Sequence, residues 1–195
     1  MMFAMSDAAS FARELTGQAA KNAAKIVKRL REFSRPGQNH EFRLPVDLND
    51  LIQDAVALTK PIWKMASAAG GTKINLSVDF GEIPTVDGDA TELREALTSL
   101  ILNAITAMPH GGSVMLRTRA KNDTVLVQVS DTGAGMNEEA RLRCLEPFST
   151  GKDQGGTDLG LDLVFASVRR HQGVIDVQSQ PGKGTTFNLL LPAAT

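Results

Sequence analysis

Apolar residues recur at helical spacing along much of the chain. In residues 6–33 they form a stripe with steps of three and four, which is typical of a helical-bundle seam: Ala12, Leu15, Ala19, Ala23, Ile26, Leu30 and Phe33. Pro36-Gly37 ends this helix, and Gln38 to Pro45 is predicted to be a linker. Asp47 is predicted to cap a second helix that runs to about Ala66.

A third helix has the clearest signal. Asp89 followed three residues later by Glu92 is a capping box, and Met108 to Gly112 ends the helix. A short helix is expected over Met136 to Glu146 and a last one over Leu159 to Gln172. The side chains of the third helix that are predicted to face inward are Leu93, Ala96, Leu97, Leu100, Ile101, Ala104 and Ile105.

Strands are predicted where apolar residues alternate with polar ones. Lys73 to Phe80 alternates, and a Lys121-Asn-Asp123 turn joins Ser113–Ala120 to Thr124–Ser130 in a hairpin. Two further strands close the sheet, Val174–Gln180 and Thr185–Leu191. The order predicts an α+β fold: a two-layer sandwich with three helices on one face of a mixed, mostly antiparallel sheet, preceded by the bundle-type helix.

Composition limits the class of protein. The chain has 195 residues, is 42% hydrophobic and carries a formal net charge of −1, which predicts a packed core and argues against a nucleic-acid-binding protein. A single cysteine, Cys144, excludes an internal disulfide. Because no apolar run approaches about 18 residues and the first residues lack the features of a signal peptide, we expect a cytoplasmic chain without membrane contact.

Two polar features stand out against this apolar pattern. Asn103 lies within the apolar third helix, where its carboxamide needs a partner; a satisfied core asparagine and a Mg²⁺ ligand explain it equally well from the helix alone. Asp131 follows an alternating strand and begins a glycine turn, Asp131-Thr-Gly-Ala-Gly-Met136, which by itself is most simply an ordinary turn. Together and in this order they indicate a site for a magnesium nucleotide.

These stretches resemble the ordered boxes of the histidine-kinase-like ATPase superfamily. Leu93 to Ala107 resembles the N box and Asp131 to Met136 the G1 box. Glu146-Pro-Phe-Ser-Thr-Gly-Lys152 resembles the F box, and Gly155-Gly-Thr-Asp-Leu-Gly-Leu161 the G2 box. Upstream, Leu30 to Pro36 and Val46 to Asp50 are similar to the junction between the dimerisation helices and the catalytic domain of a sensor histidine kinase. The resemblance covers about residues 12–192 and implies a Bergerat-type ATP-binding fold.

The resemblance implies a role for each matching residue. Asn103 would bind Mg²⁺, Asp131 would accept a hydrogen bond from the adenine amino group, and Thr185 would join that contact through water. Phe148 and Lys152 would belong to a lid over the triphosphate of ATP, with Lys152 supplying positive charge. The remaining expected contacts are turn and helix-start residues: Gly133, Gly135, Gly156, Thr157, Leu159, Gly160 and Leu161.

Two positions depart from the family pattern. Asp158 stands where the G2 box usually has a glycine, so it either caps the following helix or repels phosphate; the cap is the preferred interpretation. Ser99 stands four residues before Asn103, where the gyrase and mismatch-repair branches have a general-base glutamate. Direct ATP hydrolysis is therefore not the expected activity.

No phosphoacceptor histidine is identified. His40 lies in the predicted linker, His110 in a turn and His171 at a helix end, and we interpret all three as non-catalytic. The expected organisation is residues 1–37 as the second dimerisation helix, 38–46 as a linker and 47–195 as the catalytic ATP-binding domain.

The expected function is therefore that of a sensor histidine kinase fragment. It would bind Mg-ATP and donate the γ-phosphoryl group to a histidine on an absent dimerisation helix, for relay to a response-regulator receiver domain. The parent kinase would be a homodimer through its dimerisation helices, and this chain a weak or altered dimer. Alternatives are a degenerate kinase-like module that binds partners and an anti-sigma-type serine kinase.

Overall fold

The computed structural model describes residues 44–70, 73–145 and 160–194. The predicted bundle-type helix and most of the predicted linker lie outside the described residues, as does the stretch 146–159.

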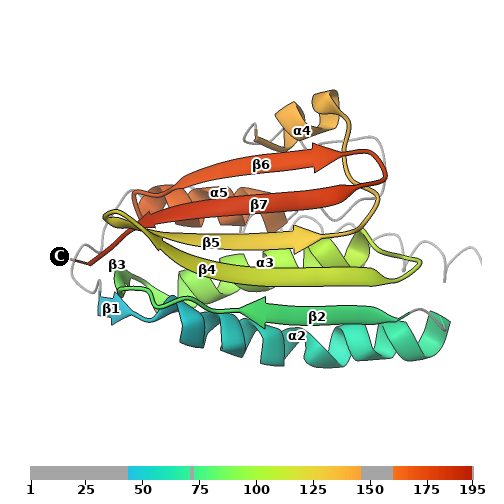
Figure 1. The fold of residues 1–195 in the computed structure, drawn as a ribbon, viewed down its shortest axis with the longest axis horizontal. Coiled ribbons are helices and arrows are strands. Elements are labelled where there is room, and N and C mark those ends of the chain that lie inside the picture. Colours follow the sequence, from blue (N-terminus) through green and yellow to red (C-terminus); the bar gives the residue numbers. More distant parts are fainter. Residues whose placement is uncertain (1–43, 71–72, 146–159, 195) are drawn as a thin grey trace, which may run out of the picture. The chain divides into compact units, whose positions relative to one another are not determined.

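The main sheet has five strands in the order β2-β4-β5-β7-β6 (Figure 1). Strand β2 is parallel to β4, and the other three pairings are antiparallel, which confirms the predicted mixed sheet. The strands are β2 (Ile74–Asp79), β4 (Gly112–Lys121), β5 (Thr124–Asp131), β6 (Val174–Gln180) and β7 (Gly184–Pro192).

Two short strands were missing from the prediction. β1 (Leu44–Val46) pairs antiparallel with β3 (Val86–Gly88) in a separate two-stranded sheet. The sequence analysis assigned Leu44 and Pro45 to a linker and predicted no strand at residues 86–88. Three residues are too few for a period of two to be visible, so only the pairing reveals these strands.

Helices α2 (Leu48–Gly70), α3 (Ala90–Thr106) and α5 (Leu161–Arg170) cover one face of the sheet, and α4 (Glu138–Leu145) lies beside edge strand β6 (Figure 1). This confirms the predicted two-layer α+β sandwich. Among the described residues, no helix is both long enough and apolar enough to cross a membrane.

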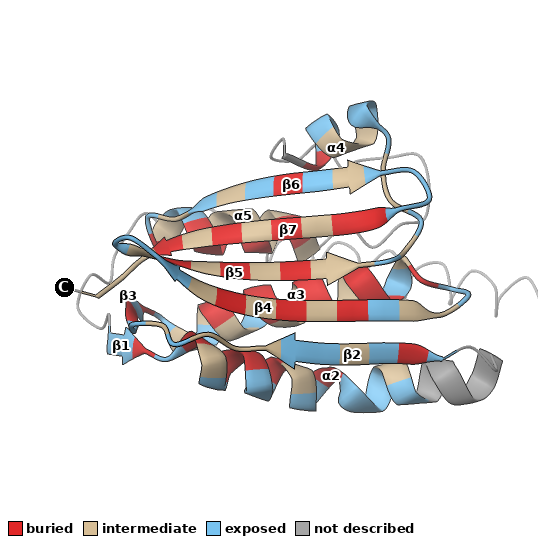
Figure 2. Cartoon of the chain, viewed as in Figure 1, coloured by how far each residue is buried: buried red, intermediate tan, exposed pale blue. Residues whose placement is uncertain are grey.

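The core lies between the helices and the sheet, as the buried positions in Figure 2 show. All seven α3 residues that the sequence predicted to face inward are buried. They meet the alternate residues of the central strands, among them Val125, Val127 and Val129 of β5. Burying this apolar stripe fixes the rotation of α3 about its axis and therefore the direction in which Asn103 points.

The opposite face of the sheet is polar. Gln128 donates to Asn188 Oδ1 at 2.9 Å, and Asn188 donates to Asp176 Oδ2 at 3.2 Å, so a hydrogen-bonded row crosses β5, β7 and β6. Near the other edge, hydrogen bonds from Arg119 and Arg117 hold the pKa of Asp79 below its ordinary value.

Aspartates cap α2 and α3 as predicted. Asp47 Oδ1 accepts from Asn49 N at 2.8 Å, and Asp89 Oδ1 accepts from Thr91 N at 2.8 Å. The second half of the predicted capping box is wrong. The Glu92 side chain does not accept a hydrogen bond from Asp89 N; its Oε2 atom lies 2.9 Å from Arg170 Nε.

His171 takes the place expected of Glu92. The Asp89 N–H donates to His171 Nε2 at 2.9 Å, and His171 Nδ1 lies 2.7 Å from the Ser167 carbonyl oxygen. Because a carbonyl oxygen only accepts, Nδ1 carries a proton. Because the Asp89 N–H only donates, Nε2 carries none, so the ring in this arrangement is neutral. Gly88 makes room for the ring, since a Cβ there would come within 2.6 Å of His171 Cδ2. The histidine therefore has a structural role, since it ties the end of α5 to the start of α3.

We predict that His171→Ala lowers the free energy of unfolding by about 1–3 kcal/mol, because the Asp89 N–H loses its buried acceptor. Chemical denaturation measures the loss. His110→Ala is the matched control: His110 is exposed, so its replacement should change stability by less than about 0.5 kcal/mol. Equal stability of the two variants would contradict a structural role for His171.

Candidate nucleotide-binding site

The predicted site residues that the structure describes lie on adjoining elements. Asn103 is on α3, Asp131 ends β5, Thr185 is on β7 next to its turn with β6, and Gly160 precedes α5. The end of β5 and the β6–β7 turn lie at the same end of the sheet, as Figure 1 shows.

Asp131 is held by two backbone groups. Its Oδ1 atom accepts from Gly133 N at 2.8 Å and from Thr185 N at 3.3 Å. Burial raises the pKa of this carboxyl, while the two backbone hydrogen bonds act in the opposite direction. In the described part of the chain both hydrogen bonds go to Oδ1, so Oδ2 can accept from a ligand amine.

The loop that follows Asp131 is attached on two sides. Ala134 N donates to Ala107 O, just after α3, at 3.0 Å, and Gly182 N in the β6–β7 turn donates to Ala134 O at 2.7 Å. One residue of this loop therefore joins the end of the Asn103 helix to the turn that precedes Thr185. This contact could not be predicted from the residue types, because it uses only backbone atoms.

The glycines of this loop serve its packing against the protein. Gly135 has a φ of +65°, and a Cβ there would overlap the carbonyl oxygen of Gln180. At Gly133 a Cβ would come within 2.6 Å of the Ala107 carbonyl oxygen. Backbone of the same chain therefore approaches both glycines closely, and their predicted contact with a ligand stays a prediction.

Thr185 is buried and has a hydroxyl neighbour across the hairpin. Its Oγ1 atom lies 2.9 Å from Ser179 Oγ, and Ser179 also contacts Met136 N at 2.8 Å. Ser179 was not singled out from the sequence. The register of the β6–β7 hairpin, which pairs Ser179 with Thr185, was the signal that could have found it.

Asn103 faces the start of α5. Its Nδ2 atom is buried and has no hydrogen-bond partner within the described ranges. Gly160, the residue at the N-cap of α5, packs against this face: a Cβ at Gly160 would overlap Ser99 Oγ and lie 3.7 Å from Asn103 Nδ2. A buried amide N–H without a partner costs free energy, so the position of Asn103 Nδ2 at the N-terminal end of α5 favours a ligand there.

The start of α5 differs from the starts of α2 and α3. Those two are capped by aspartates, whereas the described residues provide no side-chain cap hydrogen bond at the start of α5, where the first N–H groups can face an anion. Asp158, which the sequence analysis preferred as the cap, lies outside the described residues. Leu161, the first residue of α5, is buried in the core.

The other predicted contacts lie outside the described residues. These are Phe148, Lys152, Gly156, Thr157 and Leu159, together with Asp158.

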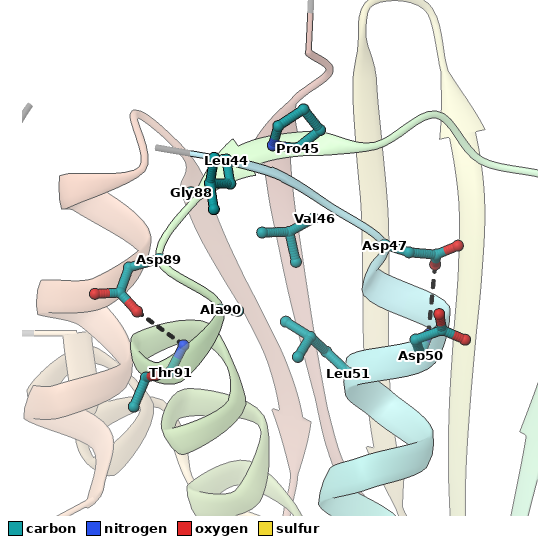
Figure 3. A pocket seen from close by; sticks show the side chains of 10 residues that line it. All are labelled: Leu44, Pro45, Val46, Asp47, Asp50, Leu51, Gly88, Asp89, Ala90 and Thr91. Atoms are coloured by element: carbon teal, nitrogen blue, oxygen red, sulfur yellow. Dashed lines mark hydrogen bonds between the residues drawn. The ribbon is translucent and has the colours of Figure 1, made fainter. Parts of the chain in front are cut away.

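A pocket of about 470 Å³ lies elsewhere, between the starts of α2 and α3 (Figure 3). Val46 and Leu51 form its apolar wall, and Asp47 and Asp89 lie on either side. Both carboxylates already cap their helices. This pocket is at the opposite end of α3 from Asn103, and it does not contain the predicted site residues.

The two-layer sandwich thus places the half-buried Asp131 and the side chain of Asn103 on elements that one loop joins. A family profile described as "Histidine kinase-, DNA gyrase B-, and HSP90-like ATPase" matches residues 88–195. The chain belongs to this family, and its described residues form the ATP-binding catalytic domain of a sensor histidine kinase.

Two curated relatives show the extent of the likeness. The non-motile and phage-resistance protein of Caulobacter vibrioides is 35% identical over 154 residues, which are 74% of this chain and 18% of that protein. Sensor kinase CckA of Brucella abortus is 33% identical over 193 residues, 90% of this chain and 19% of that kinase. The chain thus spans less than a fifth of the length of either relative.

A solved structure extends the comparison to three dimensions. The catalytic domain of histidine kinase ThkA, in a nucleotide-free form, has a TM-score of 0.67 and 25% identity; the match covers 78% of this chain and 96% of that domain. The likeness therefore spans nearly all of the ThkA domain.

We predict that Gly135→Ala is far more damaging than Gly182→Ala. Both glycines have a positive φ, +65° and +73°, so the backbone strain is matched. A Cβ at Gly182 has nothing within 4 Å, whereas one at Gly135 overlaps the Gln180 carbonyl oxygen. Gly182→Ala should cost about 1 kcal/mol and Gly135→Ala at least about 2 kcal/mol more.

Urea unfolding and ATP titration of both glycine variants provide the measurement. Gly135→Ala should also weaken ATP binding, because this loop follows Asp131 directly and its Gly133 N–H holds the Asp131 carboxylate. Similar losses for the two variants would show that the loop does not depend on close backbone contact.

Asp131→Asn should separate stability from binding. An asparagine oxygen can still accept from Gly133 N and Thr185 N, and the substitution removes a half-buried charge, so stability at neutral pH should be unchanged or higher. Burial raises the pKa of Asp131, so its penalty is present at neutral pH and disappears as the pH falls through the raised pKa towards the ordinary value of about 3.9.

Thermal unfolding of both proteins from pH 7 to pH 4 tests the stability part, and the advantage of the variant should shrink towards low pH. ATP affinity should fall at least about tenfold, because a charged acceptor is lost. A variant that is less stable at neutral pH and binds ATP normally would contradict both parts.

Proposed function

We propose that this chain binds Mg-ATP and transfers the γ-phosphoryl group to a histidine on a dimerisation helix of the parent kinase. The observation that carries the proposal is the buried Nδ2 atom of Asn103, which has no hydrogen-bond partner among the described residues and lies beside the start of α5. This atom supports a contact with the phosphates of the nucleotide. The loop after β5 connects the end of the Asn103 helix to Asp131, which would bind the adenine.

Asn103 would supply one oxygen ligand to Mg²⁺. A carboxamide oxygen suits this hard cation, which keeps several waters and bridges phosphate oxygens. Among the described residues no group of three or more His, Cys, Asp or Glu side chains could hold a metal, so the triphosphate and water would complete the coordination. The ion would offset the negative charge of the phosphates.

The remaining groups would orient the nucleotide. Asp131 Oδ2 would accept from the adenine amino group, and the first N–H groups of α5 would donate to phosphate oxygens. Catalysis would then consist mainly of positioning and charge stabilisation, because phosphoryl transfer needs little covalent participation from the protein.

The proposal includes the regions that the structure does not describe. Residues 1–37 would be the second dimerisation helix, and 38–46 the linker to the catalytic domain. Lys152 and Phe148 would cover the triphosphate, and Gly156, Thr157 and Leu159 would contact it with Gly160 and Leu161. The parent kinase would be a homodimer, and a response-regulator receiver domain would accept the phosphoryl group.

Asn103→Ala tests the site directly. We expect the full chain to bind ATP more tightly with Mg²⁺ than without it, and Asn103→Ala to abolish this difference while leaving the fold intact. Calorimetric titration measures binding, and circular dichroism checks the fold. Asn188→Ala, on the polar face of the sheet, is the control and should bind as the unchanged protein does.

Phosphotransfer is tested by mixing the chain with ATP and the dimerisation domain of a related sensor kinase. Acid-labile phosphohistidine that disappears with Asn103→Ala is the expected result. Tight Mg-ATP binding without phosphohistidine on any acceptor would favour a partner-binding module, and phosphoserine on a regulator would favour a serine kinase.

A further inference from the structure

Ser179 lies next to the adenine-end residues but belongs to none of the family boxes. It is on β6, and the hairpin register pairs it with Thr185 of β7. Its hydroxyl has three polar neighbours: it lies 2.8 Å from Met136 N, 3.1 Å from Gly184 O and 2.9 Å from Thr185 Oγ1.

The directions of these three contacts follow from the chemistry of the groups. An amide N–H only donates, so Ser179 Oγ accepts from Met136; a carbonyl oxygen only accepts, so Ser179 donates its single proton to Gly184. A hydroxyl has one donor and two acceptor positions. The remaining contact is satisfied only if Thr185 donates its proton to Ser179.

This arrangement fixes what Thr185 can offer a ligand. With its proton directed at Ser179, the Thr185 hydroxyl has only lone pairs left, and the neighbouring Asp131 carboxylate also only accepts. A 6-amino purine brings hydrogen-bond donors to such a pair. A 6-oxo purine brings an acceptor, which would face lone pairs without a proton between them.

We propose that Ser179 is a positioning residue for base selection: by holding the Thr185 proton, it makes the site prefer a 6-amino over a 6-oxo purine nucleotide. This rests on the proposed nucleotide binding. A freed Thr185 hydroxyl can rotate and donate to a 6-oxo group, so the preference depends on Ser179 even though Ser179 need not touch the base.

The test compares ATP with inosine triphosphate, which carries oxygen instead of the amino group at position 6. Titrations of the full chain with each nucleotide and Mg²⁺ give a preference ratio. Ser179→Ala should narrow this ratio by about three- to tenfold, the size of one hydrogen bond. Ser179→Thr, which keeps the hydroxyl, should restore it.

Two further variants separate positioning from general structural damage. In a Thr185→Val background, Ser179→Ala should no longer change the ratio, because no hydroxyl remains to be oriented. Ser130→Ala is the matched control, since Ser130 makes the same kind of serine–threonine contact, with Thr186, across neighbouring strands. It should leave the ratio unchanged.

The outcomes are distinct. If Ser179→Ala weakens the binding of both nucleotides equally, Ser179 only supports the loop through Met136 and the assignment is overturned. If the Ser179→Ala variant binds ATP with normal affinity and an unchanged preference ratio, the assignment is overturned while the proposed function stands. If the unchanged protein binds neither nucleotide, the proposed function itself fails.

Discussion

The site depends on how the loop after β5 is held by backbone hydrogen bonds. Ala134 joins the end of α3 on one side and the β6–β7 turn on the other. These contacts set Asp131 and Thr185 on one end of the sheet and bring α3, with Asn103, against the same loop. These two contacts use backbone atoms alone, and glycine is required where backbones meet.

The helix N-termini at the two ends of the helical layer differ in how their first N–H groups are satisfied. Aspartates satisfy the first N–H groups of α2 and α3, so those ends need no ligand even though a pocket lies between them. Within the described ranges the start of α5 has no side-chain cap, and it meets the Nδ2 atom of Asn103, which has no partner there. The contrast explains why the pocket between α2 and α3 is not the favoured site: the unsatisfied polar atom of the site lies elsewhere.

The parts of the fold that the sequence predicts are those with a local pattern. The apolar stripe of α3, the alternating valines of β5 and the caps Asp47 and Asp89 all appear where expected. Asn103 and Asp131 were found because a polar residue within an apolar stretch and a carboxylate before glycines are visible in one dimension.

The features that the sequence did not reveal depend on contacts between distant residues. The capping-box pattern predicted that Glu92 would return to Asp89 N, but His171 fills that place and Glu92 pairs with Arg170. Strands β1 and β3 exist only through their pairing. Ser179 becomes visible only once the register of the β6–β7 hairpin is known. In each case tertiary geometry decides between options that are equal locally.

The hydrogen bond between Asp89 and His171 also bears on the order of folding. It joins residues 82 positions apart, and the Asp131–Thr185 hydrogen bond joins residues 54 apart. Closing such long loops is entropically costly until the β4–β5 hairpin and the α3 layer have formed, so we expect these contacts to be made late. The nucleotide site would then be among the last parts of the domain to acquire its native geometry, and ATP would bind only to chains that have completed the sheet.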